Sequence, residues 1–211
     1  MHAFIHHALT NYHTKPLGQQ HAYAVLLPLI KNNDSYDILY QVRAHHISQP
    51  GEVSFPGGKA EANETLMHTA IRETMEELQL PKDAINIIGE IDYLVHGTRT
   101  IHCFVGVIDV PSIEHITPNE EVATLFTVPL SHLIDNPPIV YPIKTELVFP
   151  KSFPFERIPN EKAYPFHTFP HTIPFYDTYN GHTIWGMTAR FTKQFIDIIT
   201  SDLTHTPDNS H

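Results

Sequence analysis

The chain has 211 residues, a length that favours one domain with an embellishment over two complete domains. Hydrophobic residues make up 41% of it and aromatic residues 10%, which excludes a largely disordered chain. The formal net charge of -10 opposes non-specific binding to nucleic acid or to an anionic membrane surface. We therefore expect a small anionic substrate, held locally by a metal ion and a few basic groups.

The first fifteen residues contain histidines where a signal peptide would need a cationic segment and a continuous apolar core. The longest apolar run, residues 22–30, is too short to cross a bilayer. Cys103 is the single cysteine, so an internal disulfide is excluded, and we expect its thiol to be buried. Together these observations predict a cytoplasmic protein that does not associate with membranes.

Apolar patterns bounded by turn residues predict five strands. In chain order they cover residues 22–30, 38–42, 85–95, 100–110 and 122–128. Helices are expected at residues 65–78, 129–134 and 188–199. The last of these should bury Phe191, Phe195, Ile198 and Ile199. Trp185, just before it, is expected to be a core anchor, and the alternative is that its ring stacks on a base.

Residues 136–180 differ from the rest of the chain because prolines recur there among Phe, Tyr and His. Such a stretch cannot be helical, and its aromatic rings must be buried or used. Two interpretations remain open: a cap or arm that contacts the substrate or a second subunit, and a purely structural arm. The predicted organisation is a single domain over residues 1–203 that includes this arm, followed by a disordered tail at 204–211.

The most informative segment is residues 58–80, GKAEANETLMHTAIRETMEELQL. On a helix, Glu73, Glu76 and Glu77 fall within one turn on one side, opposite Met67, Ile71, Met75 and Leu78. Like charges at these spacings repel by a few tenths of a kcal/mol per pair, and the helix dipole disfavours acids near its C-terminus. A hard divalent cation reverses this balance because it prefers carboxylate oxygens.

The spacing of these residues after FPGG resembles the Nudix box, the motif of the Nudix hydrolases. The resemblance implies an α/β/α sandwich with mixed β-sheets and hydrolysis of the diphosphate of a nucleoside diphosphate derivative. It also implies Mg²⁺ or Mn²⁺ as the cofactor. The residues that match the family's metal ligands are Glu73, Glu76, Glu77 and the backbone carbonyl of Gly58.

The same resemblance implies roles for other residues in and beyond the box. Arg72 would orient the glutamates, while Glu64 and Gly57 would support the loop. The catalytic base would be Glu77 or a glutamate outside the box, for which Glu121 in NEEV is the best match and Glu120 the reserve. The box departs from the family pattern in having Thr74 at an aliphatic position and Gln79 where glycine follows the helix.

Residues 38–44, ILYQVRA, and 51–58, GEVSFPGG, resemble the extra signature of the coenzyme A diphosphatase branch, LLTxR(S/A) followed by GxxxFPGG. Members of this branch cut coenzyme A or its derivatives into 3',5'-ADP and 4'-phosphopantetheine. The signature's second arginine is missing here, with Ile47 or Ser48 in its place. Residues expected to bind substrate phosphate are Arg43, Lys59 and Arg99, with His45 and His46 as further candidates.

Two alternatives to coenzyme A hydrolysis remain. One is an enzyme acting on ADP-ribose or another compound linked to a nucleoside diphosphate. The other is a catalytically idle module that binds a nucleotide or a protein through the proline-rich arm. The arm is also compatible with a homodimer. Seventeen histidines show no spacing typical of a transition-metal site.

Overall fold

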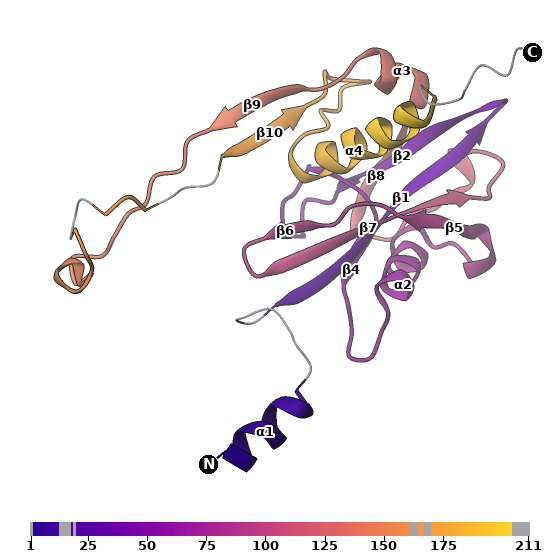
Figure 1. Cartoon of the computed structure of the whole chain (residues 1–211). Helices are drawn as coiled ribbons and strands as arrows, with labels where there is room; N and C mark the ends of the chain where they lie inside the picture. The colour runs from indigo at the N-terminus through magenta and orange to yellow at the C-terminus, as the bar shows by residue number, and fades with distance from the viewer. Residues whose placement is uncertain (1, 13–17, 19, 161–163, 167–169, 204–211) are drawn as a thin grey trace, which may run out of the picture.

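A computed structural model of the chain describes residues 2–12, 18, 20–160, 164–166 and 170–203. Its centre is a mixed sheet of eight strands in the order β3-β2-β1-β7-β5, with β4 also paired to β1, β6 to β7 and β8 to β2 (Figure 1). The strands are β1 (His21–Asn32), β2 (Ser35–Arg43), β3 (Val53–Ser54), β4 (Gly57–Lys59), β5 (Ile85–Glu90), β6 (Leu94–His96), β7 (Arg99–Ile108) and β8 (Val122–Pro129).

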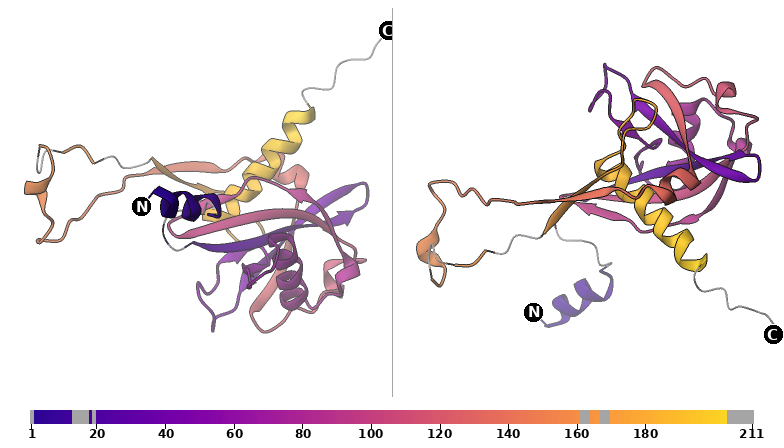
Figure 2. Two further views of the ribbon diagram at one scale, coloured as in Figure 1. Left: turned by 60° about the horizontal axis from the view of Figure 1, so that its bottom comes forward. Right: turned by 90° about the horizontal axis from the view of Figure 1, so that it is seen from above.

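Two helices cover the sheet, α2 on one face and α4 on the other (Figures 1 and 2). The helices are α1 (His2–Thr10), α2 (Leu66–Leu78), α3 (Leu130–Asp135) and α4 (Gly186–Leu203), with short 3-10 turns at Lys82–Ala84, Ile113–His115 and Phe155–Arg157. This arrangement confirms the predicted α/β/α sandwich. The sequence did not predict α1, which lies apart from the sandwich in Figure 1.

The two faces of the sheet carry separate cores. Along β1, Leu27 and Leu29 pack in the core under α4, whereas Leu26 and Ile30 pack in the core against α2. Both faces of this strand are buried because helices cover the sheet on both sides. Cys103 on β7 is also fully buried, as predicted.

The central strand β1 changes its neighbour along its length. It runs parallel to β7 from the His21↔Arg99 pair to the Ile30↔Ile108 pair. On its other edge it pairs with β2 only at Leu29–Asn32, and with β4 at residues 23–25. Because β4 replaces β2 at this point, the start of the predicted box lies beside the middle of the sheet.

Four of the five predicted strands are confirmed, and the fifth, residues 85–95, is two strands instead of one. The segment pairs with β7 first as β5 and then as β6, and its register shifts between Ile87 and Gly89. Such an irregularity bends a strand and interrupts its ladder. The apolar pattern of the segment does not reveal this break, because it continues through both strands.

The helix of the box begins and ends close to the predicted residues, but its buried face was wrong in part. Thr65 caps it by accepting a hydrogen bond from the backbone N–H of His68 at 3.3 Å. Met67, expected in the core, is 41% exposed. The residues that are buried are Thr69, Ala70, Thr74, Glu77 and Leu78. The helix is therefore turned so that Glu77 faces the sheet, and the three glutamates do not share one solvated face.

Residues near the C-terminal helix differ from prediction in two places. Phe191 and Phe195 are buried as expected, but Ile198 is exposed. Trp185, predicted as a core anchor, is 37% exposed and stacks on Phe175 with a ring-centre separation of 5.6 Å. The indole therefore covers the base of the proline-rich segment instead of filling the core.

The proline-rich segment forms a ribbon that extends away from the sandwich (Figures 1 and 2). Its base consists of β9 (Ile139–Ile143) and β10 (His171–Phe175), paired antiparallel. Farther out, the rings of Phe149, Phe153 and Phe155 contact one another at 4.7 to 5.2 Å. The described part of the segment contains no α-helix, as predicted. The predicted tail, 204–211, lies outside the described residues.

Within the described part of the chain, no helix combines the length and apolar character needed to cross a bilayer.

The residue that follows α2 provides a test of local backbone strain. Gln79 adopts a left-handed conformation with φ 51° and ψ 42°. A non-glycine residue in this region costs roughly 1 kcal/mol, so Gln79→Gly should raise the free energy of unfolding by about that amount. Urea denaturation measures the change, and Gln79→Ala is the control because it keeps the strain. Equal stability of the glycine and alanine variants would contradict this account.

Candidate active site

Two glycines let the box loop pass between the sheet and α2. A Cβ on Gly57 would lie 2.5 Å from the carbonyl oxygen of Ala24 and 2.6 Å from Cα of Val25, where no side chain fits. A Cβ on Gly58 would coincide with the carboxylate of Glu73. Glycine is therefore required at position 57, where the neighbouring atoms are backbone, and at position 58 it lets the backbone approach the Glu73 carboxylate.

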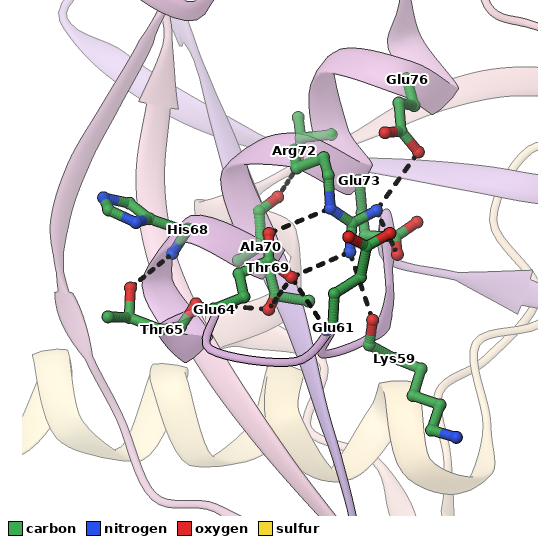
Figure 3. Close-up of polar contacts among 11 residues, drawn as sticks. Lys59, Glu61, Glu64, Thr65, His68, Thr69, Ala70, Arg72, Glu73 and Glu76 are labelled. Atoms are coloured by element: carbon green, nitrogen blue, oxygen red, sulfur yellow. Dashed lines mark hydrogen bonds and ion pairs between the residues drawn. The ribbon is translucent and has the colours of Figure 1, made fainter.

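Arg72 is the hub of the site and bonds to groups from a strand, a loop and a helix (Figure 3). Its Nε and one terminal nitrogen donate to the two carboxylate oxygens of Glu64 at 3.0 and 3.1 Å. The other terminal nitrogen donates to Glu73 at 2.9 Å and to Glu76 at 3.4 Å. The carbonyl oxygen of Lys59 accepts a further bond at 3.2 Å. One guanidinium therefore fixes two of the predicted ligands relative to β4.

Glu64 is held in place by more than its bidentate pair with Arg72. Its Oε2 also accepts bonds from the Thr69 hydroxyl at 2.8 Å and from the backbone N–H of Glu61 at 3.1 Å. The bonds from Arg72 and then from Glu61 lower the pKa of this carboxyl to about 2. Glu64 is thus ionised at neutral pH and ties the loop 59–64 to the helix.

The three helix glutamates differ in burial. The Glu76 side chain is 55% exposed, whereas the Glu77 residue is only 6% exposed. Burial raises the pKa of Glu77 to about 7, opposed by bonds from Gln41 and from the backbone N–H of Gly57, while the charges of Glu73 and Glu121 raise it further. The pKa of Glu73 is also raised, chiefly by burial, with Arg72 opposing and Glu76 and Glu121 reinforcing the shift.

Glu121 lies on a different loop, which forms backbone hydrogen bonds to α2 and to the residue that follows β2. The N–H of Asn119 donates to the carbonyl oxygen of Glu77 at 2.8 Å, and the carbonyl oxygen of Glu121 accepts from the N–H of Ala44 at 2.8 Å. Because its charge acts on both Glu73 and Glu77, the Glu121 carboxylate shares their electrostatic environment. No corresponding effect is described for Glu120, so the structure favours Glu121 as the glutamate beside the box.

The donors in this group suit a hard divalent cation, although their present positions do not form a closed site. Among the described residues, no three acidic, histidine or cysteine side chains converge closely enough to count as a metal site. Arg72 holds an oxygen of Glu73 and of Glu76. Four carboxylates with mutually unfavourable charges nevertheless provide the all-oxygen, anionic environment that Mg²⁺ and Mn²⁺ prefer.

A cleft of about 500 Å³ opens beside the box loop. Gly57 and Gly58 form part of its wall, and two of the predicted phosphate-binding residues, Arg43 and Arg99, line it as well. Arg43 is held by bonds from Nε to the carbonyl oxygen of Ser48 at 2.7 Å and from a terminal nitrogen to its hydroxyl at 3.1 Å. Arg99 lies over the ring of Tyr23, 5.4 Å from its centre.

Other residues proposed for phosphate binding lie elsewhere. Lys59 is exposed, is not among the residues that line the cleft, and extends its ammonium group away from the carboxylates (Figure 3). His45 and His46 are likewise not among the lining residues. Ser48, which occupies the neighbourhood of the missing second arginine, does line the cleft and bonds to Arg43. The cationic wall of the cleft thus consists of Arg43 and Arg99.

The sequence did not indicate Gln41 as a residue of the site, and it favoured a position in the core for Trp185, which lies at the cleft. Gln41 is buried and its amide nitrogen donates to Glu77. It lies two residues before Arg43, and a polar residue there in an apolar strand was the available sign. Trp185 lines the cleft beside Met187, which the expectation of a core anchor did not anticipate.

A family model and individual proteins both match this chain. A family model described as NUDIX domain matches residues 20–148. The chain is 30% identical to an uncharacterized Nudix hydrolase, NudL, of Photorhabdus laumondii over 84% of this chain and 83% of that protein. It is 35% identical to the mitochondrial coenzyme A diphosphatase NUDT8 of Homo sapiens, over 53% of this chain and 49% of that protein.

The match covers only part of several relatives. It spans 49% of Nudix hydrolase 3 of Caenorhabditis elegans and 58% of NudL of Enterobacter, so about half the length of these curated relatives is involved. Among solved structures, a MutT/nudix family protein from Enterococcus faecalis superposes with a TM-score of 0.50 at 12% identity. That superposition covers 94% of this chain and 69% of the other, and it supports the fold alone.

Burial of Glu77 predicts a pH dependence of stability in the metal-free protein. The unfolded chain ionises this carboxyl near its ordinary pKa of about 4.3, whereas the folded protein retains the proton until pH is about 7. The free energy of unfolding should therefore fall as pH rises between these values, by on the order of 3 kcal/mol at most. Glu77→Gln should remove this part of the decline.

Urea unfolding in the presence of a chelator, at about pH 5 and about pH 8, measures the effect. Glu76→Gln is the matched control, because the Glu76 side chain is 55% exposed and should leave the decline in place. The same pH dependence in Glu77→Gln and in the unaltered protein would contradict the assignment of this change to Glu77.

Proposed function

The chain belongs to the NUDIX family, and from this premise we propose that it hydrolyses the diphosphate bond of a nucleoside diphosphate derivative. The proposed substrate is coenzyme A or one of its derivatives, cut into 3',5'-ADP and 4'-phosphopantetheine. The observation that carries the proposal is the grouping of Glu73, Glu76, Glu77 and Glu121 beside a cleft whose cationic residues are Arg43 and Arg99.

In this proposal the metal is held by Glu73, Glu76, Glu77 and the backbone carbonyl of Gly58. When bound, Mg²⁺ or Mn²⁺ supplies positive charge to the diphosphate and lowers the pKa of a water. Arg72 keeps Glu73 and Glu76 oriented through its bonds to both.

Glu121 is proposed as the general base. The Glu77 carboxylate already accepts hydrogen bonds from Gln41 and from the backbone N–H of Gly57. The Glu121 residue is exposed, so its oxygens are accessible to the attacking water. Proton transfer to a carboxylate within hydrogen-bond reach is an ordinary form of general base catalysis. The acid generated would return its proton to solvent.

Coenzyme A is preferred over other nucleotides for two reasons. The chain carries most of the LLTxR(S/A) and GxxxFPGG signature, and NUDT8, named as a coenzyme A diphosphatase, is 35% identical over 119 residues. The substrate also has a 3'-phosphate in addition to its diphosphate, so two cations in the cleft have separate anionic groups to neutralise. Arg43 is fixed by Ser48 and would bind phosphate without further ordering.

A metal-dependent assay with coenzyme A, ADP-ribose, NADH and diadenosine polyphosphates tests the proposal. We expect hydrolysis of coenzyme A to 3',5'-ADP, identified by chromatography, and a loss of roughly 100-fold or more in kcat for Glu76→Gln. Glu156→Gln on the ribbon is the control and should retain full activity. Cleavage of ADP-ribose in preference to coenzyme A would support the other enzyme, and binding without turnover would support an idle module.

Removal of the cationic side chain in the cleft should weaken substrate binding. A charge-assisted bond is worth about 1.5 to 3 kcal/mol, so Arg43→Ala should raise KM for coenzyme A by roughly 10- to 100-fold. Arg43→Lys should recover part of the affinity because it keeps the charge but loses the guanidinium geometry. Steady-state kinetics measures both, with the exposed Lys82→Ala as a control. An unchanged KM in Arg43→Ala would remove Arg43 from the site.

A further inference from the structure

Gln41 is a buried polar residue in an otherwise apolar part of β2. It is 3% exposed, and its neighbours in sequence, Tyr40 and Val42, point to the opposite face of the sheet. A buried amide needs hydrogen-bond partners for both its nitrogen and its oxygen, since it loses contact with water on folding. Its amide nitrogen has hydrogen-bond partners among the described residues and its carbonyl oxygen has none, and this difference indicates the role of Gln41.

The amide nitrogen of Gln41 is used within the protein. It donates a short hydrogen bond to Oε2 of Glu77 and lies 3.4 Å from the hydroxyl of Ser54. The other oxygen of Glu77 receives the backbone N–H of Gly57 at 3.4 Å. The carboxylate of Glu77 is thus held from two sides, by the central sheet and by the box loop.

The carbonyl oxygen of Gln41 has no protein partner. Among the described buried side chains, Oε1 of Gln41 is one of two atoms without a hydrogen bond. An apolar residue would fill the same space without leaving an acceptor unsatisfied. A donor that is absent from the protein itself, such as a water molecule, would satisfy this oxygen beside Glu77.

Gln41 departs from the signature that the strand otherwise resembles. In the signature LLTxR(S/A), aligned on Arg43, threonine stands where this chain has Gln41. The threonine side chain is shorter and offers a single hydroxyl, so it cannot reproduce both the bond to Glu77 and the free carbonyl. The glutamine therefore adds a contact that the signature residue does not provide.

We propose that Gln41 is a positioning residue that orients the Glu77 carboxylate for metal binding and accepts a hydrogen bond from a water at the same place. The amide nitrogen fixes Oε2 of Glu77, while Oε1 accepts only the long bond of 3.4 Å from the backbone N–H of Gly57 and keeps a lone pair for the cation. The carbonyl oxygen of Gln41, which has no hydrogen-bond partner among the described residues, would accept a hydrogen bond from a water at the same place. Such partners of metal ligands commonly affect metal affinity by about 10- to 100-fold. This inference rests on the proposed function, because it assigns Glu77 to the metal.

Binding of Mn²⁺ alone, without substrate, tests the role directly. Titration of the full-length, metal-free protein, followed by electron paramagnetic resonance of free Mn²⁺, should show about tenfold weaker binding in Gln41→Leu. In kinetics the same variant should lose kcat while KM for coenzyme A changes little, since Gln41 does not touch the substrate. Affinity equal to that of the unaltered protein would overturn the proposal.

Two further variants separate positioning from a general loss of stability. Gln41→Thr introduces the residue of the signature and should also weaken Mn²⁺ binding. This variant replaces Gln41→Leu in the titration if the leucine variant does not fold. Thr192→Val is the matched control: it removes the 3.0 Å bond between Thr192 and Tyr40, the residue next to Gln41, on the other face of the sheet. It should lower thermal stability and leave Mn²⁺ affinity unchanged. Equal weakening in the control would show a structural effect and overturn the proposal.

The outcomes also distinguish this inference from the proposed function. If the unaltered protein cleaves coenzyme A with Mn²⁺ but the Gln41 variants bind the ion normally, the function stands and the role of Gln41 falls. If it binds Mn²⁺ and cleaves no diphosphate, the function falls, and the affinity ratio between Gln41→Thr and the unaltered protein still decides the role of Gln41. Absence of Mn²⁺ binding in the unaltered protein would overturn both.

Discussion

The site depends on one guanidinium group placed among carboxylates that repel one another. Arg72 contacts Glu64, Glu73 and Glu76 and the carbonyl oxygen of Lys59. Because these groups belong to β4, the loop after it and α2, the same cation joins the three pieces of chain that make up the box. Individual exposed ion pairs contribute little to stability, but a bidentate pair within a network is better defined in geometry. Without this cation the carboxylates would not be held together in the absence of a metal ion.

Burial divides the carboxylates into groups with different properties. Glu64 is ionised because Arg72 and backbone N–H groups stabilise its charge, whereas Glu77 is shielded from water between α2 and the sheet. Glu76 and Glu121 remain accessible to solvent. Positive charge arriving at this place would be favoured by every member of the group that is ionised, and it would favour ionisation of Glu77. The unfavourable electrostatics of the metal-free site are thus consistent with a site that is completed by a cation.

The sheet determines where the cleft lies. Because β1 pairs with β4 along one half and with β2 along the other, β2 diverges from the centre of the sheet and brings Arg43 to the wall of the cleft. The start of α4 closes another side with Trp185 and Met187. Trp185 also stacks on Phe175 at the base of the ribbon, so the cleft and the ribbon are in physical contact. The ribbon therefore begins beside the candidate active site.

The sequence by itself determined four of the five strands and the helix of the box, because these follow from periodicity and spacing along the chain, and the resemblance to the Nudix box implied the sandwich. It did not determine which way the box helix faces. Helical periodicity placed Met67 in the core and Glu77 outside it, whereas packing against the sheet exposed Met67 and buried Glu77. The contact of Gln41 with Glu77 and the exposure of Trp185 also came only from the tertiary structure. Each depends on the distance between segments far apart in sequence, and local pattern contains no information on that distance.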